Sequence, residues 1–146
     1  MSRTESAGQS RHLASAHRTF SIEIQALQAL RDRLDARFDQ AVEMLLACHG
    51  RTVVTGIGKS GHIARKMAAT LASTGTPAFF MHGAEAMHGD LGMLTGHDIV
   101  IAISYSGSAA ELLTVLNVAK RMGAQMISIT GNPESELARN ADLHLD

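Results

Sequence analysis

The sequence predicts an α/β fold, a three-layer α/β/α sandwich whose five-stranded parallel sheet is preceded by long N-terminal helices. Two observations carry this prediction. From residue 52 onward, short runs of small and β-branched apolar residues alternate with segments of helical periodicity, and strands that alternate with helices form parallel sheets covered on both faces. Before residue 52 the periodicity of the apolar residues is helical from Ala14 to Ala47.

The N-terminal third is predicted to be helical after a short polar start. Residues 1–12 lack apolar periodicity, and we expect them to be disordered. From Ala14 to Ala47 apolar residues recur at three- and four-residue steps, as in an amphipathic helix, and the Asp35–Asp39 region is expected to divide it in two. Such a helix ahead of the first strand favours contact with another copy of the chain as well as with its own sheet, so we expect a homo-oligomer.

The remaining elements follow from the alternation. The expected strands are Thr52–Thr55, Pro77–Met81, Ile99–Ile103, Gln125–Thr130 and one that starts at Leu143–Leu145, and the expected helices are Ser60–Ser73, a short turn at Ala84–His88, Ala109–Met122 and Pro133–Asn140. Gly75 and Gly123 follow helices, where glycine commonly ends them, and Pro133 suits a helix start. Ligands of such sheets bind at the carboxyl ends of the strands, so the loops that follow the strands are the candidate site.

Composition narrows the class of protein. The 146 residues fit one domain with a sizeable core. A net charge of −1, no basic block, 3% aromatic residues and no Trp argue against a nucleic-acid partner. No apolar run approaches the roughly 20 residues that cross a bilayer, and no signal peptide is visible. A single cysteine, Cys48, excludes an internal disulfide and fits a reducing compartment, so we expect a cytoplasmic protein.

The loop after the third strand is the stretch around which the chain is organised. Ile99–Ile103 reads as a strand buried on both faces, and a helical pattern follows from Ala109. Between them lie three hydroxyls and a glycine, in Ser104, Ser106, Gly107 and Ser108. At a helix N-terminus the free backbone N–H groups and the helix dipole favour an anion, and Glu111 lies about one turn into the helix. This arrangement predicts a phosphate site beside a carboxylate.

The first strand ends in Gly56-Ile57-Gly58-Lys59-Ser60-Gly61, which matches G-x-G-x-x-G and contains G-K-S. A P-loop would need glycine at position 53, which is Val53. A dinucleotide site would need an acidic residue at the end of the second strand, which instead ends in His82. A small phosphorylated ligand is the preferred interpretation, with Lys59 as cation and Ser60 as hydroxyl donor. Glycines that serve only a tight turn stay an alternative.

The loops after the second and fourth strands carry further polar residues. His82, Glu85, His88 and Asp90 lie within nine residues, but their spacing matches no zinc motif, so no metal is expected. His88 is a candidate for substrate contact or proton transfer, with a structural histidine as the alternative. The run Thr130–Ser135 lies at the same sheet edge, where it could close the site from one side or form a plain turn.

Four motifs in order then carry a resemblance: GIGKSGHIARKMAATLASTGTPAFF, HGAEAMHGDLGM, AISYSGSAAE and ITGNPES. Together they resemble the sugar isomerase (SIS) domain, and most closely the isomerase domain of bacterial arabinose 5-phosphate isomerases, over roughly residues 15–146. The resemblance implies that residues 13–146 form a phosphosugar-binding SIS domain that assembles as a tetramer. It also implies interconversion of D-arabinose 5-phosphate and D-ribulose 5-phosphate, a step that feeds Kdo and lipopolysaccharide biosynthesis, without a metal or nucleotide cofactor.

The resemblance also assigns roles to residues of this sequence. Catalysis is expected from Lys59 as stabiliser of the oxyanion, His88 in proton shuttling or ring opening, and Glu111 as base. Substrate contacts are expected from Gly58, Ser60, Ser104, Ser106, Gly107 and Ser108. Moving a proton between adjacent carbons requires a base near the carbon, a donor near the oxygens and stabilisation of the enediolate.

Two departures from the family pattern bear on activity. The family loop usually reads S-N-S-G-E-[ST]-x-E, whereas this chain has Tyr105 for Asn, Ser108 for Glu and Ala109 for the hydroxyl residue. Family members also continue past the fifth strand, so the domain is expected to be truncated after Asp146. A non-catalytic phosphosugar-binding or regulatory module is therefore the alternative function, and a dinucleotide-binding protein is a weaker third.

Overall fold

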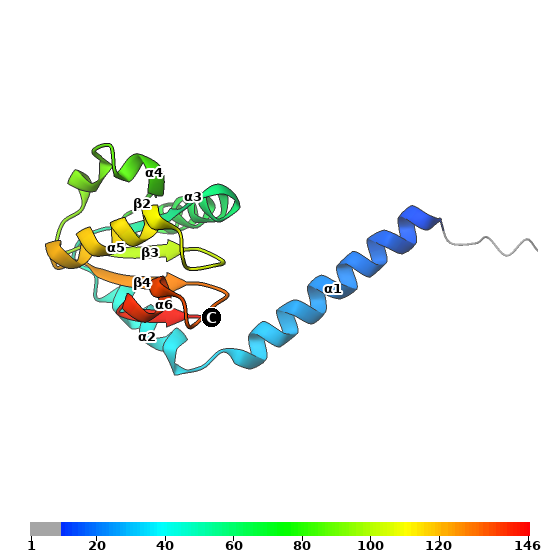
Figure 1. The fold of residues 1–146 in the computed structure, drawn as a ribbon. Helices are drawn as coiled ribbons and strands as arrows, with labels where there is room; N and C mark the ends of the chain where they lie inside the picture. The colour runs from blue at the N-terminus through cyan, green and yellow to red at the C-terminus, as the bar shows by residue number, and fades with distance from the viewer. Residues whose placement is uncertain (1–9) are drawn as a thin grey trace, which may run out of the picture. The chain divides into compact units, whose positions relative to one another are not determined.

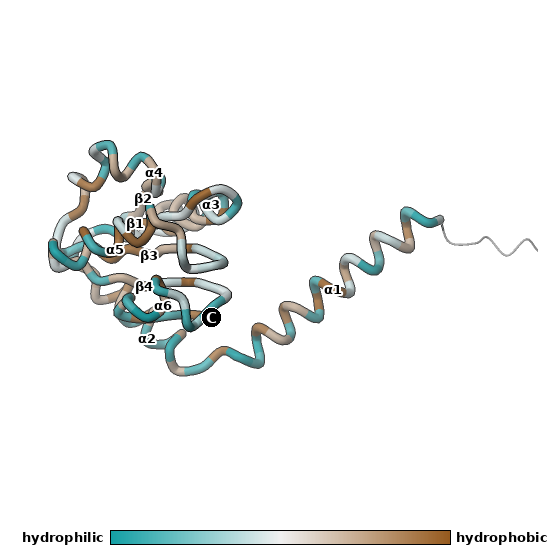
Figure 2. Tube along the Cα trace, viewed as in Figure 1, coloured by the Kyte–Doolittle hydropathy of each residue, from teal (hydrophilic) through white to brown (hydrophobic). Residues whose placement is uncertain are grey.

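The computed structural model describes residues 10–146, which divide into two compact units, residues 10–35 and 36–146. In the first unit a single helix, α1 (Arg11–Arg33), carries no buried residue. Residues 1–9 of the predicted disordered segment lie outside the described residues, whereas Arg11 and His12 already belong to α1. Along α1 the hydropathy alternates between apolar and polar positions (Figure 2).

The second unit holds the second of the predicted N-terminal helices and the alternating strands and helices predicted from residue 52 onward (Figure 1). The strands are β1 (Thr52–Gly56), β2 (Ala78–His82), β3 (Ile99–Ile103), β4 (Gln125–Ile129) and β5 (Leu143–Leu145). The helices are α2 (Ala36–Leu46), α3 (Gly58–Ser73), α4 (Gly83–Ala86), α5 (Ala110–Met122) and α6 (Glu136–Asn140), with a 3₁₀ turn, η1 (Asp90–Met93), between α4 and β3.

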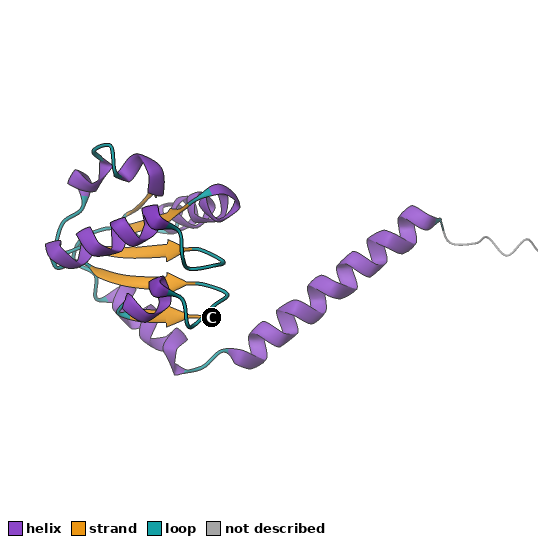
Figure 3. Cartoon of the chain, viewed as in Figure 1, coloured by secondary structure: helices purple, strands orange, loops and turns teal. Residues whose placement is uncertain are grey.

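All five strands are parallel, in the order β2-β1-β3-β4-β5. Their carboxyl ends therefore meet at one edge, where the arrowheads point the same way (Figure 3). The register brings Gly56, Ile103 and Ile129 into one row at this edge. The predicted α/β fold with a five-stranded parallel sheet is confirmed.

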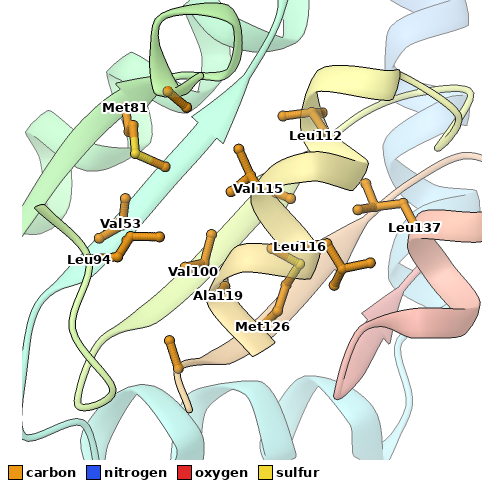
Figure 4. Packing of buried hydrophobic residues seen from close by; sticks show 13 residues of the cluster. Val53, Met81, Leu94, Val100, Leu112, Val115, Leu116, Ala119, Met126 and Leu137 are labelled. Carbon is orange, nitrogen blue, oxygen red and sulfur yellow. The ribbon is translucent and has the colours of Figure 1, made fainter. Parts of the chain in front are cut away.

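Two apolar clusters make the sheet the middle layer of a sandwich. On one face, side chains of α4, α5 and α6 pack against the strands, and Leu112, Val115 and Ala119 of α5 lie over Val53 and Val100 (Figure 4). The other face is covered by α2 and α3. The side chains of Val53, Val54 and Val100 have no exposed area, which explains why the central strands read as continuous apolar runs rather than as alternating ones.

The boundaries differ from the predicted ones at two places that matter. The helical lead-in breaks at Leu34 and Asp35, so the break includes the first residue of the predicted Asp35–Asp39 region. Pro133 does not start the last helix, since α6 begins at Glu136 and is capped by Ser135, whose hydroxyl oxygen accepts from the Ala138 N–H. Gly123 ends α5 in the left-handed conformation with a φ of 82°, as predicted for a glycine after a helix.

The amino-terminal edge of the sheet is held by a buried carboxylate. Asp98, 2% exposed, precedes β3 and accepts hydrogen bonds from the backbone N–H groups of Arg51 at 2.7 Å and Thr95 at 2.8 Å. The Arg51 guanidinium lies 3.6 Å from the carboxylate oxygen that Thr95 contacts. Burial raises the pKa of Asp98, but these donors outweigh burial and lower the pKa below its ordinary value of 3.8.

Candidate functional site

Two helices with uncapped N-termini follow neighbouring strands at the carboxyl edge of the sheet. Because Gly56 and Ile103 are in register, the loops that follow β1 and β3 are neighbours. The helices that they start, α3 and α5, have Ile57 and Ala109 as N-caps, and neither makes a side-chain capping bond. The N–H groups of both first turns are therefore open to a ligand, and both helix dipoles favour a negative one.

The glycines of the β1–α3 loop have two different roles. A Cβ at Gly56 would lie 2.9 Å from the Ser60 carbonyl carbon, and one at Gly61 would lie 2.9 Å from the Gly56 oxygen, so these two allow the strand end to touch the helix. Gly58 has a φ of 56° and open space around it. The turn that glycine permits thus leaves Lys59 exposed and Ser60 half-buried at the start of α3.

The β3–α5 loop, residues 104–108, is called the anion loop below. Ser104 is buried, and its hydroxyl oxygen accepts from the Gly107 N–H at 3.1 Å, so it shapes the loop from inside. Gly107 takes a φ of 63°. The exposed hydroxyls of Ser106 and Ser108 lie 3.1 Å apart. Two hydroxyls therefore converge at the N-terminus of α5, as an anion site requires.

The three predicted catalytic residues lie in three elements. Lys59 is the second residue of α3, Glu111 is the second residue of α5 and half-buried, and His88 is exposed in the turn after α4. Within residues 10–146 none of the three side chains makes a hydrogen bond or an ion pair with another protein group. Lys59 and Glu111 thus lie in the first turns of the helices that follow β1 and β3, whereas His88 lies in the turn that follows α4, and their catalytic roles stay a prediction.

A fourth segment, after β4, holds the anion loop in place. The backbone N–H of Ser104 donates to Ile129 at 3.0 Å, that of Gly131 to Tyr105 at 3.0 Å, and that of Leu137 to Gly107 at 3.1 Å. A Cβ at Gly107 would overlap the Ser135 hydroxyl. The sequence placed Thr130–Ser135 at this edge but left its role open. These contacts show that it supports the anion loop.

His144, in β5, belongs to the same support. Its Nε2 lies 3.0 Å from the Thr130 hydroxyl, which also bonds the backbone of Asn132 at 2.9 Å. His82 is likewise structural, because its Nδ1 accepts from the Ala84 N–H and caps α4. His62, in α3, and His88, after α4, are both exposed, and His88 is the one that the sequence predicts to take part in catalysis.

The metal and membrane expectations can be compared with the structure. In residues 10–146 no group of three or more His, Cys, Asp or Glu side chains is arranged to hold a metal ion. None of the described helices combines the length and the apolarity that crossing a bilayer requires.

The chain is similar to curated proteins named arabinose 5-phosphate isomerase KdsD. It is 56% identical to the Pseudomonas aeruginosa protein over 132 residues, which cover 90% of this chain and 40% of that one. It is 54% identical to the Escherichia coli K12 protein over 125 residues, which cover 86% of this chain and 38% of that one. The chain therefore spans about 40% of the length of these relatives.

The chain is also similar to solved structures. The structure of E. coli CFT073 c3406 in complex with arabinose 5-phosphate superimposes with a TM-score of 0.85 at 46% identity, covering 92% of this chain and 72% of that one. A putative sugar-phosphate isomerase from Listeria monocytogenes superimposes with a TM-score of 0.87 at 34% identity, covering 93% and 73%. The SIS domain family model matches residues 45–146. The chain belongs to the SIS domain family.

Proposed function

We propose that this chain carries the active site of an aldose–ketose isomerase that interconverts D-arabinose 5-phosphate and D-ribulose 5-phosphate. The observation that carries the proposal is the pair of uncapped N-termini of α3 and α5 at one sheet edge, with Lys59 and Glu111 in their first turns. The identity to proteins named arabinose 5-phosphate isomerase supports a pentose 5-phosphate as the substrate. The reaction would take place in the cytoplasm and supply Kdo for lipopolysaccharide.

The phosphate would be held by the first-turn amides of α3 and α5 together with the hydroxyls of Ser60, Ser106 and Ser108. Ser104 would contribute by fixing the anion loop, since its oxygen already accepts from the Gly107 N–H. Each hydrogen bond to a charged group contributes about 1.5–3 kcal/mol. Ser108 lies within 3.1 Å of the Ser106 hydroxyl, so it can take the place of the hydroxyl that Ala109 lacks.

Isomerisation of the open-chain aldose transfers one proton from C2 to C1. In the proposed mechanism Glu111 removes the C2 proton, and the electron pair forms the C1–C2 double bond of an enediolate. Lys59 stabilises the negative charge on the oxygen, and His88 moves protons between the O1 and O2 atoms or opens the furanose ring. Return of the proton to C1 gives the ketose. General acid–base catalysis of this kind contributes about 10²- to 10⁴-fold.

In the proposed oligomer, α1 would provide contacts between copies of the chain. Large apolar side chains of α1 are exposed, including Phe20 at 69% and Leu27 at 66%. Contiguous apolar surface of this kind marks protein contacts, and we propose a homotetramer in which these side chains are covered by other copies.

A second candidate is a binding module without turnover, and Ala109 in place of a hydroxyl residue favours it. The two are separated by incubating the protein with D-ribulose 5-phosphate and following the appearance of D-arabinose 5-phosphate by ¹³C NMR. Equilibration of the two sugars supports the isomerase. Saturable binding of D-ribulose 5-phosphate in calorimetry without equilibration would support the module instead. Absence of both would refute the phosphosugar site itself.

A further inference from the structure

Tyr105 stands in the middle of the anion loop, yet its ring lies on the side of the loop that faces β4. Its side chain is 85% exposed. A Cβ at Gly131 would lie 2.8 Å from the ring's Cε2 and 2.9 Å from Cδ2, so the ring lies directly against the Cα of that glycine. In the strand order β2-β1-β3-β4-β5, Gly131 follows β4, whereas Lys59 and Ser60 follow β1. The Tyr105 ring therefore does not cover the side of the anion loop that faces β1, where the ligand would bind.

The backbone on both sides of Tyr105 is fixed, so its side chain is the part that can move. The Tyr105 carbonyl oxygen accepts from the Gly131 N–H at 3.0 Å. Its neighbour Ser104 donates its N–H to Ile129, and Gly107 accepts from Leu137. With these bonds in place, the ring can change position only by rotation among its staggered χ1 states.

We propose that Gly131 is a specificity-determining residue of the site proposed above, because the absence of a side chain at this position leaves room for the Tyr105 ring beside the anion loop. The inference rests on the proposed function and concerns which ligands the site admits. An alanine at 131 would bring its Cβ closer to the ring than carbon atoms approach, and the flexible ring would move before the backbone does. The displaced ring obstructs the sugar part of a pentose phosphate, whereas an inorganic phosphate, which ends at the loop, is little affected.

The first experiment tests whether the Tyr105 ring packs against Gly131 in the absence of any ligand. Tyr105 is the only tyrosine of the chain, which has no Trp, so its ring signals in NMR are unambiguous. We expect nuclear Overhauser effects between the Tyr105 ring protons and the Gly131 Hα protons in the wild-type protein, and their loss in Gly131→Ala. Their absence from the wild-type protein would overturn the inference.

The second experiment measures binding of D-arabinose 5-phosphate and of inorganic phosphate by calorimetry. Gly131→Ala is expected to weaken pentose phosphate binding by about tenfold, a free-energy change of about 1.4 kcal/mol, and to change phosphate binding less. Adding Tyr105→Ala to Gly131→Ala should return the affinity to that of Tyr105→Ala alone. Gly92→Ala is the matched control, since a Cβ added to Gly92 would meet no atom within 4 Å and its φ is an ordinary one.

Three outcomes contradict the inference. Equal losses for both ligands would mean that the backbone of the loop has moved rather than the ring. A double variant that stays impaired would show that Tyr105 is not the obstruction, and an unchanged Gly131→Ala would show that no obstruction exists. A wild-type protein that binds neither ligand would refute the proposed function and this inference together, whereas the other outcomes leave the proposed function standing.

Discussion

The two edges of the sheet use charge in opposite ways. At the amino-terminal edge, Asp98 accepts two backbone N–H groups and pairs with Arg51, and Asp142 accepts the Met126 N–H at 2.7 Å. At the carboxyl edge, Lys59 and Glu111 bond no protein group within the described residues. A carboxylate that is satisfied by the protein adds stability, whereas one left free at a ligand-binding edge is available for chemistry.

The contrast extends to the backbone. The Asp98 carboxylate accepts hydrogen bonds from backbone N–H groups that precede β1 and β3, so a side chain satisfies these donors where the chain enters the sheet. Where the chain leaves the sheet, Ile57 and Ala109 make no capping bonds, and the first turns of α3 and α5 stay open. We infer that stability is provided at one edge and ligand binding at the other. Each prediction below attempts to break that division.

The largest expected effect is on catalysis. Glu111→Gln removes the proposed base and should lower turnover by about 10²- to 10⁴-fold, with little change in thermal stability because the side chain bonds nothing in residues 10–146. The measurement is the rate of sugar equilibration beside a thermal denaturation curve. Glu136→Gln is the control, since Glu136 also lies in the first turn of a helix, α6, at the same edge. Full activity of Glu111→Gln would remove Glu111 as the base.

The next effect is on stability at the opposite edge. Asp98→Asn places an NH₂ group against a backbone N–H of Arg51 or Thr95, and it should destabilise the protein by about 1–3 kcal/mol. Activity per folded molecule should be kept. Denaturant unfolding measures the loss, and Asp32→Asn serves as the control because its ion pair with Arg31 is exposed, where such pairs contribute about 0–1 kcal/mol.

The same variant tests the pH dependence. Because the pKa of Asp98 is lowered in the folded protein, its contribution is fully present above the unfolded-state value of 3.8 and is lost as the pH falls through the lower folded value. Wild-type stability should therefore fall more steeply with acid than that of Asp98→Asn below about pH 4. Parallel curves for the two proteins would contradict the buried-carboxylate account.

The sequence predicted the order of strands and helices well, because buried parallel strands and glycine-ended helices leave local signals. Ile99–Ile103 is observed with the predicted bounds. The sequence could not predict that the Ser104 hydroxyl oxygen accepts a hydrogen bond from its own loop. Nor could it predict that the Leu137 N–H donates to the carbonyl oxygen of Gly107, thirty positions away. Such contacts depend on how β3 and β4 align, and no local pattern encodes them. The predicted helix start at Pro133 was wrong because Ser135 is the better N-cap, and α6 begins after it.

The smallest effect concerns the missing hydroxyl, and it would sharpen the division most. Ala109 is the N-cap of α5 and makes no side-chain bond, so Ala109→Ser adds a capping hydroxyl that should stabilise the unliganded protein by about 0.5–2 kcal/mol. Position 109 directly follows the anion loop in the chain, and a hydroxyl there that donates to the phosphate should tighten pentose phosphate binding by up to about tenfold. Calorimetry and thermal denaturation measure the two effects, with Ala110→Ser as the control one position inside the helix. Tighter binding would show that Ser108 replaces the absent hydroxyl only in part, whereas unchanged binding would show that Ser106 and Ser108 already fill that position.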